Sequence, residues 1–332
     1  MRLEGATALI TGADGFIGSH LTEALAAKGA HVKAFCWYNS LGSRGWLDHM
    51  TGSNAADVEF ILGDIRDAAT VRSASVGCDV IFHLAALIGI PYSYRAPDSY
   101  VATNVGGTLN VLQAARDLDV ARVVVTSTSE VYGTAMYVPI DERHPLQGQS
   151  PYSASKIGAD KMAEAFARTY QLPVVTVRPF NTYGPRQSAR AIIPTIISQL
   201  VAGRSNLELG LLSPTRDFNY VSDTCEAFLA LGECDEAVGR EVNVGSGKEI
   251  SIGDLAQMIA GIWGSRVTLS SAESRLRPPA SEVERLVANS SLMHGLTGWS
   301  PQVSLRDGLT RTIAWFSEPG NLSKYRAGLY AV

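Results

Sequence analysis

The chain has 332 residues, of which 46% are hydrophobic and 18% charged, and its formal net charge is −4. Such a composition excludes disordered and fibrous proteins, and the length favours one large domain with a smaller one beside it. Acidic and basic residues are interspersed without any basic run that would hold a nucleic-acid backbone, so we expect no nucleic-acid partner.

The N-terminal segment and the cysteines are typical of a cytoplasmic protein. Residues 1–10 run directly into a short apolar strand and show no signal-peptide pattern. No window reaches the ~20 apolar residues that span a bilayer, so we expect no membrane attachment. The four cysteines form no CxxC pair and no zinc-type Cys/His cluster. We therefore predict reduced thiols, no metal site and a cytoplasmic location.

Short apolar runs alternate with helical patterns through the first half of the chain. The predicted strands are Thr7–Ile10, His31–Cys36, Val58–Leu62, Asp79–Leu84, Arg122–Ser127 and Val174–Arg178. The predicted helices are Phe16–Lys28, Asp98–Leu118 and Tyr152–Tyr170. This alternation predicts an α/β fold with a doubly wound parallel sheet, whose ligand sites lie at the carboxyl ends of the strands.

After Arg178 the pattern loosens, because prolines and glycines punctuate it. A strand at Phe218–Val221 and a helix at Asp223–Leu231 are expected to rejoin the sheet. The stretch Ile250–Phe316 carries two helical patterns around a polar loop. We predict a dinucleotide-binding domain of residues 1–178 and 217–248, a smaller mixed α/β substrate lobe of residues 179–216 and 249–318, and a poorly packed tail of residues 319–332.

A glycine-rich turn joins the first strand to the first helix. Gly12, Gly15 and Gly18, with Phe16 and Ile17 between the last two, have the spacing that permits a tight turn, close approach of a pyrophosphate and helix–strand packing. The free N–H groups at the start of the helix would then face the phosphates. This strand–turn–helix context predicts a dinucleotide site.

The ends of the third and fourth strands add cofactor-binding candidates. Asp64, followed by Ile65, is a candidate acceptor for an adenine amino group, although Asp64 or Asp67 is also suited to cap a helix. The run Leu84-Ala85-Ala86 has small residues that let the backbone approach a cofactor. His83, just before this run, is expected to be packed rather than catalytic.

The second strand lacks the carboxylate that usually holds the adenosine ribose at its end. Asn39 or Ser40 stands there as a candidate ribose ligand. Arg44 could instead meet the 2′-phosphate of NADP, or be a solvated loop residue. We expect NAD as the cofactor and leave NADP open.

Tyr152 and Lys156 form the sharpest signal. Ser150 and Pro151 suit the cap and first residue of a helix, so the two side chains lie one turn apart. An ammonium ~4 Å from the phenol, at an effective dielectric of ~20, favours the phenolate by roughly 4 kcal/mol and brings the pKa of Tyr152 from about 10 toward neutrality, against desolvation. This predicts a general base.

Thr128-Ser129-Glu130 follows the fifth predicted strand, at the catalytic edge of the sheet. Together with the glycine turn, Asn104, the Tyr152/Lys156 pair and Arg178-Pro179-Phe180-Asn181, this run resembles the extended short-chain dehydrogenase/reductases (Rossmann fold) that modify nucleotide sugars. Residues 130–198 are similar to bacterial nucleotide-N-acetylhexosamine 4,6-dehydratases. The resemblance covers nearly the whole chain and implies a homodimer.

The resemblance also implies a reaction on a UDP-, GDP- or dTDP-linked sugar. Tyr152 and Lys156 would oxidise C4, with Thr128 holding the ketone. Glu130 would remove the C5 hydrogen, the C6 hydroxyl would leave as water, and hydride would return to C6, giving a 4-keto-6-deoxy sugar. Ser129 stands where dTDP-glucose enzymes have an aspartate that protonates the leaving hydroxyl, so Glu130 or a water must carry that proton.

Four further side chains are candidates for the substrate. Arg216 and Arg277, and more weakly Arg190, have guanidinium forks that match diphosphate oxygens, and Asn181 suits a phosphate or sugar oxygen. UDP-glucuronate decarboxylase and nucleotide-sugar 4-epimerase are the alternative activities. The decarboxylase would need a cation such as Arg186 or Arg277 for its substrate carboxylate. The alternative outside enzymes is a cofactor-sensing binding protein.

Overall fold

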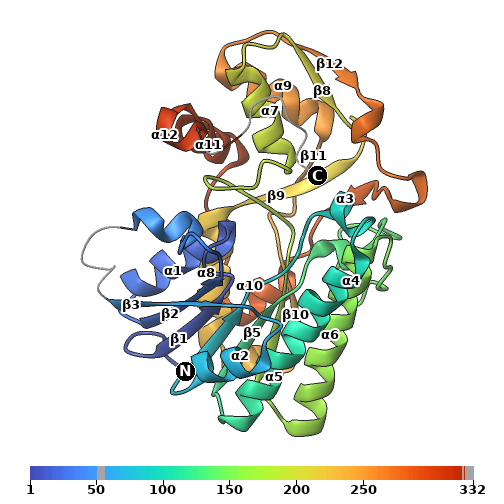
Figure 1. Ribbon diagram of the computed structural model, residues 1–332. Helices are drawn as coiled ribbons and strands as arrows, with labels where there is room; N and C mark the ends of the chain where they lie inside the picture. The colour runs from blue at the N-terminus through green and yellow to red at the C-terminus, as the bar shows by residue number, and fades with distance from the viewer. Residues whose placement is uncertain (51–56, 324, 326–332) are drawn as a thin grey trace.

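A computed structural model describes residues 1–50, 57–323 and 325. Its main feature is a seven-stranded parallel sheet in the order β10-β6-β5-β4-β1-β2-β3 (Figure 1). The strands are β1 (Thr7–Thr11), β2 (His31–Trp37), β3 (Val58–Gly63), β4 (Val80–His83), β5 (Arg122–Thr126), β6 (Val174–Pro179) and β10 (Glu241–Val244). The order reverses between β1 and β4, as in dinucleotide-binding sheets. The predicted doubly wound α/β fold is confirmed.

Helices cover both faces of this sheet. They are α1 (Phe16–Ala27), α2 (Ala68–Ser75), α5 (Gly107–Asp117), α6 (Pro151–Tyr170), α8 (Val221–Glu233) and α10 (Ser291–Thr297). Because strand side chains alternate between faces, Leu9 and Ile81 pack with α2, α5 and α6, whereas their neighbours Ile10 and Phe82 pack with α1 and α8. The sheet therefore has a hydrophobic core on each side.

The predicted helix Asp98–Leu118 is interrupted. The chain forms α3 (Ile90–Ser93) and α4 (Pro97–Tyr100), then a π-helical turn at Val101–Gly106, and only then α5. A π-turn widens the backbone by one residue, and such turns often lie at functional sites. This one contains Asn104, whose side chain is buried against the residues after β4.

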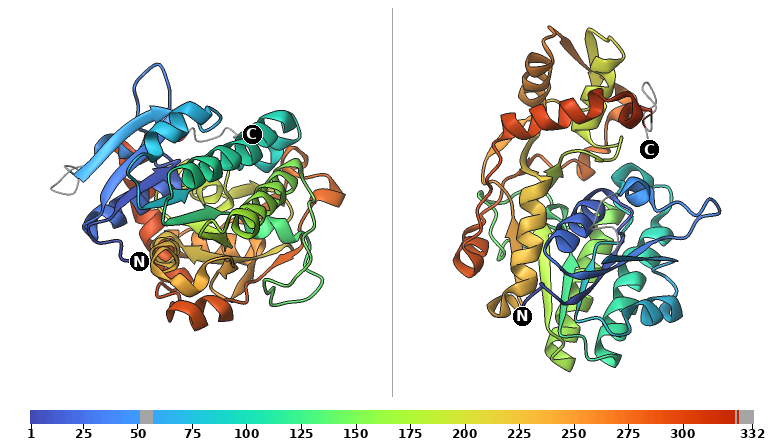
Figure 2. Two further views of the ribbon diagram at one scale, coloured as in Figure 1. Left: turned by 90° about the horizontal axis from the view of Figure 1, so that it is seen from below. Right: turned by 90° about the vertical axis from the view of Figure 1, so that its left-hand side faces the viewer.

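A smaller lobe lies beyond the carboxyl ends of the parallel strands (Figures 1 and 2). Its central strand β9 (Thr215–Tyr220) pairs with β7 (Asn181–Tyr183), β11 (Glu249–Ser251) and β13 (Arg285–Leu286), and β8 (Asn206–Leu209) pairs with β12 (Thr268–Ser271). Its helices are α7 (Ile192–Val201), α9 (Ile252–Trp263) and α11 (Leu305–Ser317). Between Ile250 and Phe316 the chain thus forms α10 as well as the two expected helices.

The prediction that the strand at Phe218–Val221 rejoins the main sheet is wrong. β9 belongs to the smaller sheet, and β10 takes the place beside β6. The difference follows from polarity, because β10 places the apolar Val242 and Val244 in the core, whereas β9 buries Arg216 and Asp217, which need polar partners.

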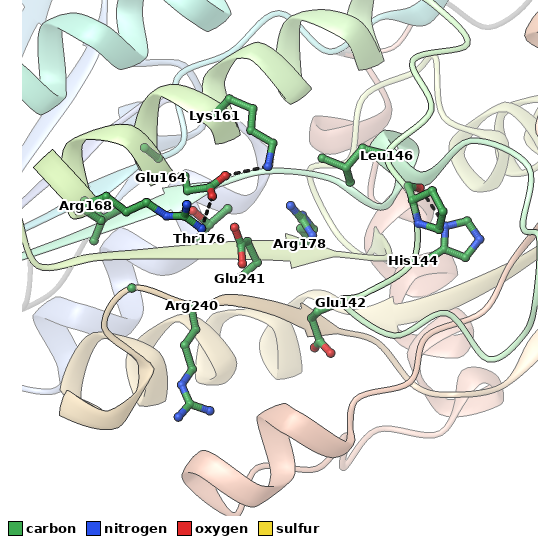
Figure 3. Close-up of a pocket in the computed structure, with 15 residues that line it drawn as sticks. Glu142, His144, Leu146, Lys161, Glu164, Arg168, Thr176, Arg178, Arg240 and Glu241 are labelled. Carbon is green, nitrogen blue, oxygen red and sulfur yellow. Dashed lines mark hydrogen bonds and ion pairs between the residues drawn. The ribbon is translucent and has the colours of Figure 1, made fainter.

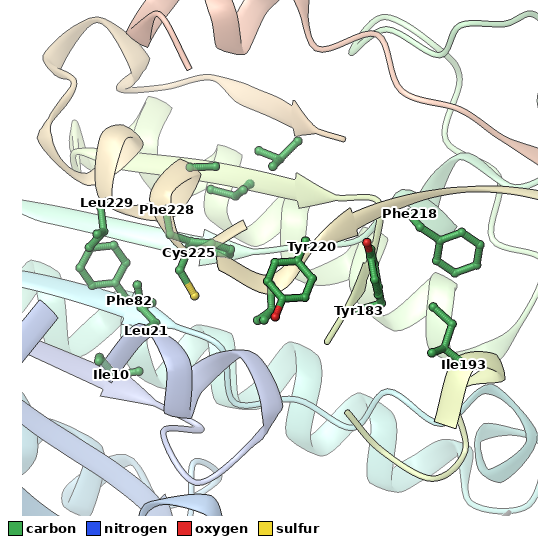
Figure 4. Close-up of a cluster of buried hydrophobic side chains, with 14 of the residues drawn as sticks. Ile10, Leu21, Phe82, Tyr183, Ile193, Phe218, Tyr220, Cys225, Phe228 and Leu229 are labelled. Carbon is green, nitrogen blue, oxygen red and sulfur yellow. The ribbon is translucent and has the colours of Figure 1, made fainter. Parts of the chain in front are cut away.

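The sheet and the lobe share one hydrophobic cluster. It runs from Ile10 and Phe82 in the sheet through Phe228 on α8 to Tyr220 on β9 and Ile193 on α7 (Figure 4). A continuous core of this kind holds the lobe over the ends of the strands, where the predicted site residues lie.

The predicted tail is partly packed. α12 (Pro319–Leu322) leads to Tyr325, which is buried, while Lys324 and residues 326–332 lie outside the described residues. The Tyr325 ring stacks on Trp46 at 6.0 Å and meets Phe316 at 4.7 Å between centroids. Its hydroxyl donates a hydrogen bond to the Gln187 carbonyl at 2.8 Å. At Tyr325 the expectation of poor packing is therefore wrong.

Candidate active site

The glycine turn and the end of β4 approach each other closely. Gly12 has φ +70°, and a Cβ there would lie 2.8 Å from the Ala85 nitrogen. A Cβ at Gly18 would lie 2.1 Å from the Gly12 carbonyl oxygen. Gly15 precedes α1, whose first residues are Phe16 and Ile17. Only glycines permit this turn, and it leaves the start of α1 free for a pyrophosphate.

The end of β2 differs from the expected ribose site. The Asn39 side chain donates to the carbonyls of Trp37 and Ser43 and accepts from two backbone N–H groups of its own loop. Its hydrogen-bonding capacity is therefore used to close the loop. Ser40 is exposed, and Arg44 lies 4.2 Å from the Phe60 ring centroid.

The two aspartates after β3 have separate roles. Asp67 caps α2, because its side chain accepts from the N–H groups of Ala69 and Thr70. Asp64 forms an ion pair with Arg66 at 2.6 Å, which lowers the pKa of its carboxyl. Ile65 is buried beside it. Asp64 therefore keeps a charged carboxylate at the edge of the sheet where an adenine would lie.

The residues after β4 are fixed by Asn104 and by a packed histidine. The Asn104 side chain accepts from the Leu87 N–H at 2.8 Å and donates to Ser155 on α6 at 2.9 Å. Asn104 thus positions the segment Leu84-Ala85-Ala86-Leu87 and α6. His83 is 2% exposed and lies between the Thr11 and Thr108 hydroxyls, and burial lowers its pKa to about 3. His83 is packed, as predicted.

Helix α6 begins with a reciprocal cap that places Tyr152 in its first turn. The Ser150 hydroxyl accepts from the Ser153 N–H at 3.1 Å, and the Ser153 hydroxyl accepts from the Ser150 N–H at 2.9 Å. Tyr152 is buried and hydrogen-bonds the Thr128 side chain. The Lys156 ammonium donates to the Thr126 carbonyl at 2.6 Å. The end of β5 therefore fixes both reactive groups.

The expected depression of the Tyr152 pKa is not found without the cofactor. Burial raises the pKa of Tyr152 above its ordinary value, and the Thr128 hydrogen bond lowers it. Burial also lowers the pKa of Lys156 to about 8. Desolvation therefore has the largest effect on the pKa of both groups, and the depression predicted from the Tyr152/Lys156 spacing is wrong.

The turn after β5 brings Glu130 toward Tyr152. Thr128 caps a short 3-10 turn, Ser129–Tyr132, by accepting from the Glu130 N–H at 3.2 Å. Ser129 is buried, and Glu130 is half-buried. The Glu130 charge contributes to raising the pKa of Tyr152, so the two groups interact electrostatically.

The two main candidate arginines meet at a carboxylate that the sequence did not indicate. Glu282 lies 3.4 Å from Arg216 and 3.8 Å from Arg277. Burial lowers the pKa of the Arg216 guanidinium, whereas the charge of Glu130 raises it. Arg216 thus has Glu130, Glu282 and Arg277 as its charged neighbours. Glu282 was missed because it is 66 residues from Arg216 in sequence.

Arg190 and Asn181 also lie near this site. A Cβ at Gly89 would be 3.3 Å from Nη1 of Arg190, and the charge of Arg190 acts on the Tyr100 hydroxyl. The Tyr100 ring packs edge-on against Tyr152, with centroids 6.2 Å apart. Asn181 is half-buried and donates weakly to the Asp217 carbonyl at 3.4 Å.

Arg186 lies elsewhere, because its guanidinium pairs with Glu23 on α1 at 2.8 Å. A cavity of about 500 Å³ between α6, β6 and β10 also lies apart from the site (Figure 3). Its lining includes none of the predicted site residues, although it does include Arg178.

Neither a spanning helix nor a metal cluster is found in the part of the chain that the structure describes. No helix there combines the length and the apolar character needed to cross a membrane. No group of three or more His, Cys, Asp and Glu side chains there is arranged to hold a metal ion. All four cysteines are free thiols.

Comparisons with known proteins show the family of the chain. The family model described as GDP-mannose 4,6 dehydratase matches residues 9–312. A UDP-glucose 4-epimerase of Mycolicibacterium smegmatis is 35% identical over 93% of this chain and 97% of its own. A dTDP-glucose 4,6-dehydratase of an Actinoplanes species is 32% identical over 93% of this chain and 97% of its own.

Solved structures give the same result. A dTDP-glucose 4,6-dehydratase of Streptomyces venezuelae with NAD bound has a TM-score of 0.82 and 32% identity, over 94% of this chain and 97% of that one. An NAD-dependent NDP-hexosamine 5,6-dehydratase of tunicamycin biosynthesis has a TM-score of 0.81 and 29% identity, over 94% and 97%. The chain therefore belongs to the GDP-mannose 4,6-dehydratase family, among the extended short-chain dehydrogenase/reductases that act as nucleotide-sugar dehydratases or epimerases.

Proposed function

We propose that this protein is a nucleotide-sugar 4,6-dehydratase that makes a 4-keto-6-deoxy sugar. The observation that carries the proposal is Glu130, a half-buried acid on the turn after β5 whose charge acts on Tyr152. Elimination across C5 and C6 needs a base at C5 in addition to the base at the C4 hydroxyl. Glu130 and Tyr152 supply these two bases from adjacent elements.

The proposed cofactor is NAD, which when bound would supply the acceptor for the C4 hydride and its later donor to C6. The close approach of Gly12 to Ala85, and the open start of α1, fit a dinucleotide. The preference for NAD is supported by Arg44, which stacks on Phe60 and pairs with Asp48 at 3.6 Å, so that it is engaged within the protein. NAD is bound in the Streptomyces dehydratase structure. We expect denaturation of the purified protein to release NAD.

The protein groups then move protons in a fixed order. Tyr152 accepts the C4 hydroxyl proton, and Thr128 and Tyr152 hold the ketone oxygen. The ketone acidifies the C5 hydrogen, which Glu130 removes as the C6 hydroxyl leaves with a proton, as water. Ser129 is a poor acid, so Glu130 itself or a water supplies that proton. Arg216 and Arg277 are proposed to hold the diphosphate, with Asn181 on a neighbouring oxygen and Arg190 at the edge of the site.

A 4-epimerase is the second candidate, favoured by the similarity to the mycobacterial UDP-glucose 4-epimerase. An epimerase also oxidises C4, but it leaves C5 untouched. A UDP-glucuronate decarboxylase would need a cation for the C6 carboxylate, and Arg277, which lies 3.8 Å from Glu282, is the candidate near this site. The three activities therefore differ in what happens after C4 oxidation.

The deciding experiment combines a substrate panel with Glu130→Gln. UDP-, GDP- and dTDP-hexoses, N-acetylhexosamines and UDP-glucuronate are incubated with the protein in deuterated water, and the products are examined by mass spectrometry and NMR. The proposal predicts loss of water and deuterium at C5. Glu130→Gln should still reduce the bound cofactor, then stall, with product formation slowed about 10²–10⁴-fold.

Glu59→Gln, at an exposed site on β3, is the matched control and should behave as wild type. Loss of carbon dioxide would identify a decarboxylase. An unchanged mass with an unlabelled C5 would identify an epimerase. Either product would overturn the dehydratase proposal.

A further inference from the structure

Helix α6 carries a third ionisable side chain in line with Tyr152 and Lys156. Asp160 follows Lys156 by four residues, just as Lys156 follows Tyr152, so the three side chains lie on one face at successive turns. Asp160 is 2% exposed. The proton transfers described above use Tyr152 but not Asp160. Burying a carboxylate costs free energy unless the carboxylate is paired and hydrogen-bonded, so the contacts of Asp160 are informative.

The contacts of Asp160 involve only one of its two oxygens. Oδ2 accepts from the Ser127 hydroxyl at 2.8 Å and from Nε and Nη2 of Arg178 at 3.1 and 3.0 Å. Oδ1 is buried and receives no hydrogen bond from any described residue. Buried polar atoms without a partner are rare and call for an explanation. The carbonyl of Thr126, the residue before Ser127, accepts a hydrogen bond from the Lys156 ammonium. The ammonium and the Asp160 carboxylate therefore both contact the end of β5.

Asp160 is paired with a cation although it is buried. Burial raises the pKa of its carboxyl above the ordinary value, and the charge of Arg178, the Ser127 hydrogen bond and the charge of Lys156 oppose that rise. The two-pronged contact with Arg178 is typical of an ionised carboxylate. Arg178 also donates to the Tyr132 hydroxyl at 3.1 Å.

The other groups around Lys156 do not supply a counter-charge. His83 on β4 is neutral, since burial lowers its pKa to about 3. Glu130 acts on Tyr152 and Arg216, and Glu241 on β10 acts on Arg178. Burial lowers the pKa of Lys156 to about 8, and Asp160 raises it.

We propose that Asp160 is a positioning residue for the catalytic pair and acts as the internal counter-ion of Lys156, keeping its ammonium charged when substrate and cofactor exclude water. The inference rests on the C4-oxidation step of the proposed function, which dehydratases, decarboxylases and epimerases share. It adds a third member to the Tyr152/Lys156 pair.

The proposal predicts the direction in which the pH profile of C4 oxidation moves when the charge of Asp160 is removed. Asp160 raises the pKa of both Lys156 and Tyr152, so removal of its charge lowers both. C4 oxidation needs Tyr152 deprotonated and Lys156 protonated, so the whole bell-shaped profile should move to lower pH. We expect a displacement of about one pH unit for Asp160→Asn, and hence roughly tenfold slower cofactor reduction on the alkaline limb.

The first measurement does not depend on activity. The chain has only six lysines, so the ¹³C resonance of the Lys156 ε-carbon can be assigned with Lys156→Met and followed through a pH titration. Asp160→Asn should lower the pKa of Lys156 by about one unit. Glu164→Gln is the matched control, because Glu164 lies one turn further along α6 and pairs only with Lys161 and Arg168 among described residues. Glu164→Gln should leave the pKa of Lys156 unchanged.

A variant of the partner separates charge from folding. Arg178→Lys disturbs the geometry of the same buried ion pair as Asp160→Asn, but it keeps a cation beside Asp160 and so keeps that carboxylate charged. It should therefore leave the pKa of Lys156 unchanged, whereas Asp160→Asn lowers it. A purely structural role would displace the pKa of Lys156 in the same direction in both variants, or leave it unchanged in both, and either result would overturn the proposal.

The second measurement follows cofactor reduction against pH after substrate is added. The Asp160→Asn variant should reduce the cofactor at a near-normal rate at the acidic end of the pH range and much more slowly at the alkaline end. An equal loss at every pH would reject the counter-ion role. If the wild-type protein reduces no cofactor with any nucleotide sugar, the proposed function fails, while the lysine titration still decides the role of Asp160.

Discussion

At the scale of single residues, the end of β5 determines where the reactive groups of α6 lie. The Thr126 carbonyl accepts a hydrogen bond from the Lys156 ammonium, and the Thr128 side chain hydrogen-bonds Tyr152. A strand end is a rigid support, so these contacts hold the phenol in place before substrate arrives. The same contacts bury the phenol, which raises its pKa, so the ammonium and the cofactor must work against desolvation.

Tyr152→Phe removes only the oxygen that accepts the C4 proton. We expect cofactor reduction to slow by about 10²–10⁴-fold, while binding of the sugar nucleotide, measured by calorimetry, changes little. Tyr170→Phe, at the half-exposed end of the same helix, is the control and should retain full activity. Near-normal turnover of Tyr152→Phe would show that another group accepts the proton.

The sequence predicts the residues that follow a local pattern and misses those that depend on distant contacts. Tyr152 and Lys156 are one helical turn apart, so their proximity can be read from spacing. Glu282 reaches Arg216 across 66 residues, and no local pattern signals that contact. Asn39 illustrates the opposite error, because a plausible ribose ligand uses its side chain to close its own loop.

At the scale of elements, periodicity predicts buried strands well and long helices less well. The stretch Asp98–Leu118 has a helical pattern throughout, yet it contains a π-turn. The pattern cannot show this, because an inserted residue in the helix changes hydrogen bonding without changing composition. β9 was misplaced for a related reason, since its buried polar residues Arg216 and Asp217 find their partners in segments distant in sequence, such as Glu282 and Ser246.

Ser150→Ala tests how far an element controls the chemistry. Loss of the reciprocal cap should lower the free energy of unfolding by about 1 kcal/mol and the melting temperature by about 2–4 °C. Because Tyr152 lies in the uncapped turn, kcat should also fall several-fold. Ser304→Ala is the matched control, since the Ser304 side chain also caps a helix, α11, by accepting from the Asp307 N–H. If both variants lose equal stability and equal activity, the cap of α6 has no specific catalytic role.

At the scale of the whole molecule, an aromatic cluster joins the glycine turn to the smaller lobe. The backbone N–H of Trp46 donates to the Asp14 carbonyl within the glycine turn at 3.2 Å. The Trp46 ring packs against Trp315 of α11 at 5.5 Å between centroids, and Tyr325 stacks on Trp46 and also packs against Trp315. The sequence predicts two lobes from two separated pieces of chain, but not this connection, because its members are scattered over nearly 280 residues.

Tyr325→Ala removes the ring that joins this cluster. Its removal leaves a cavity against Trp46, Trp315 and Phe316, and we expect the free energy of unfolding to fall by about 3 kcal/mol. Tryptophan emission should move to longer wavelength, because both indoles gain contact with water. Since Trp46 is tied to the glycine turn, the dissociation constant for the dinucleotide should rise several-fold. Tyr170→Ala, at a 50% exposed site at the end of α6, is the control and should change neither property. An unchanged melting temperature in Tyr325→Ala would show that this end of the chain is dispensable, as the sequence alone suggests.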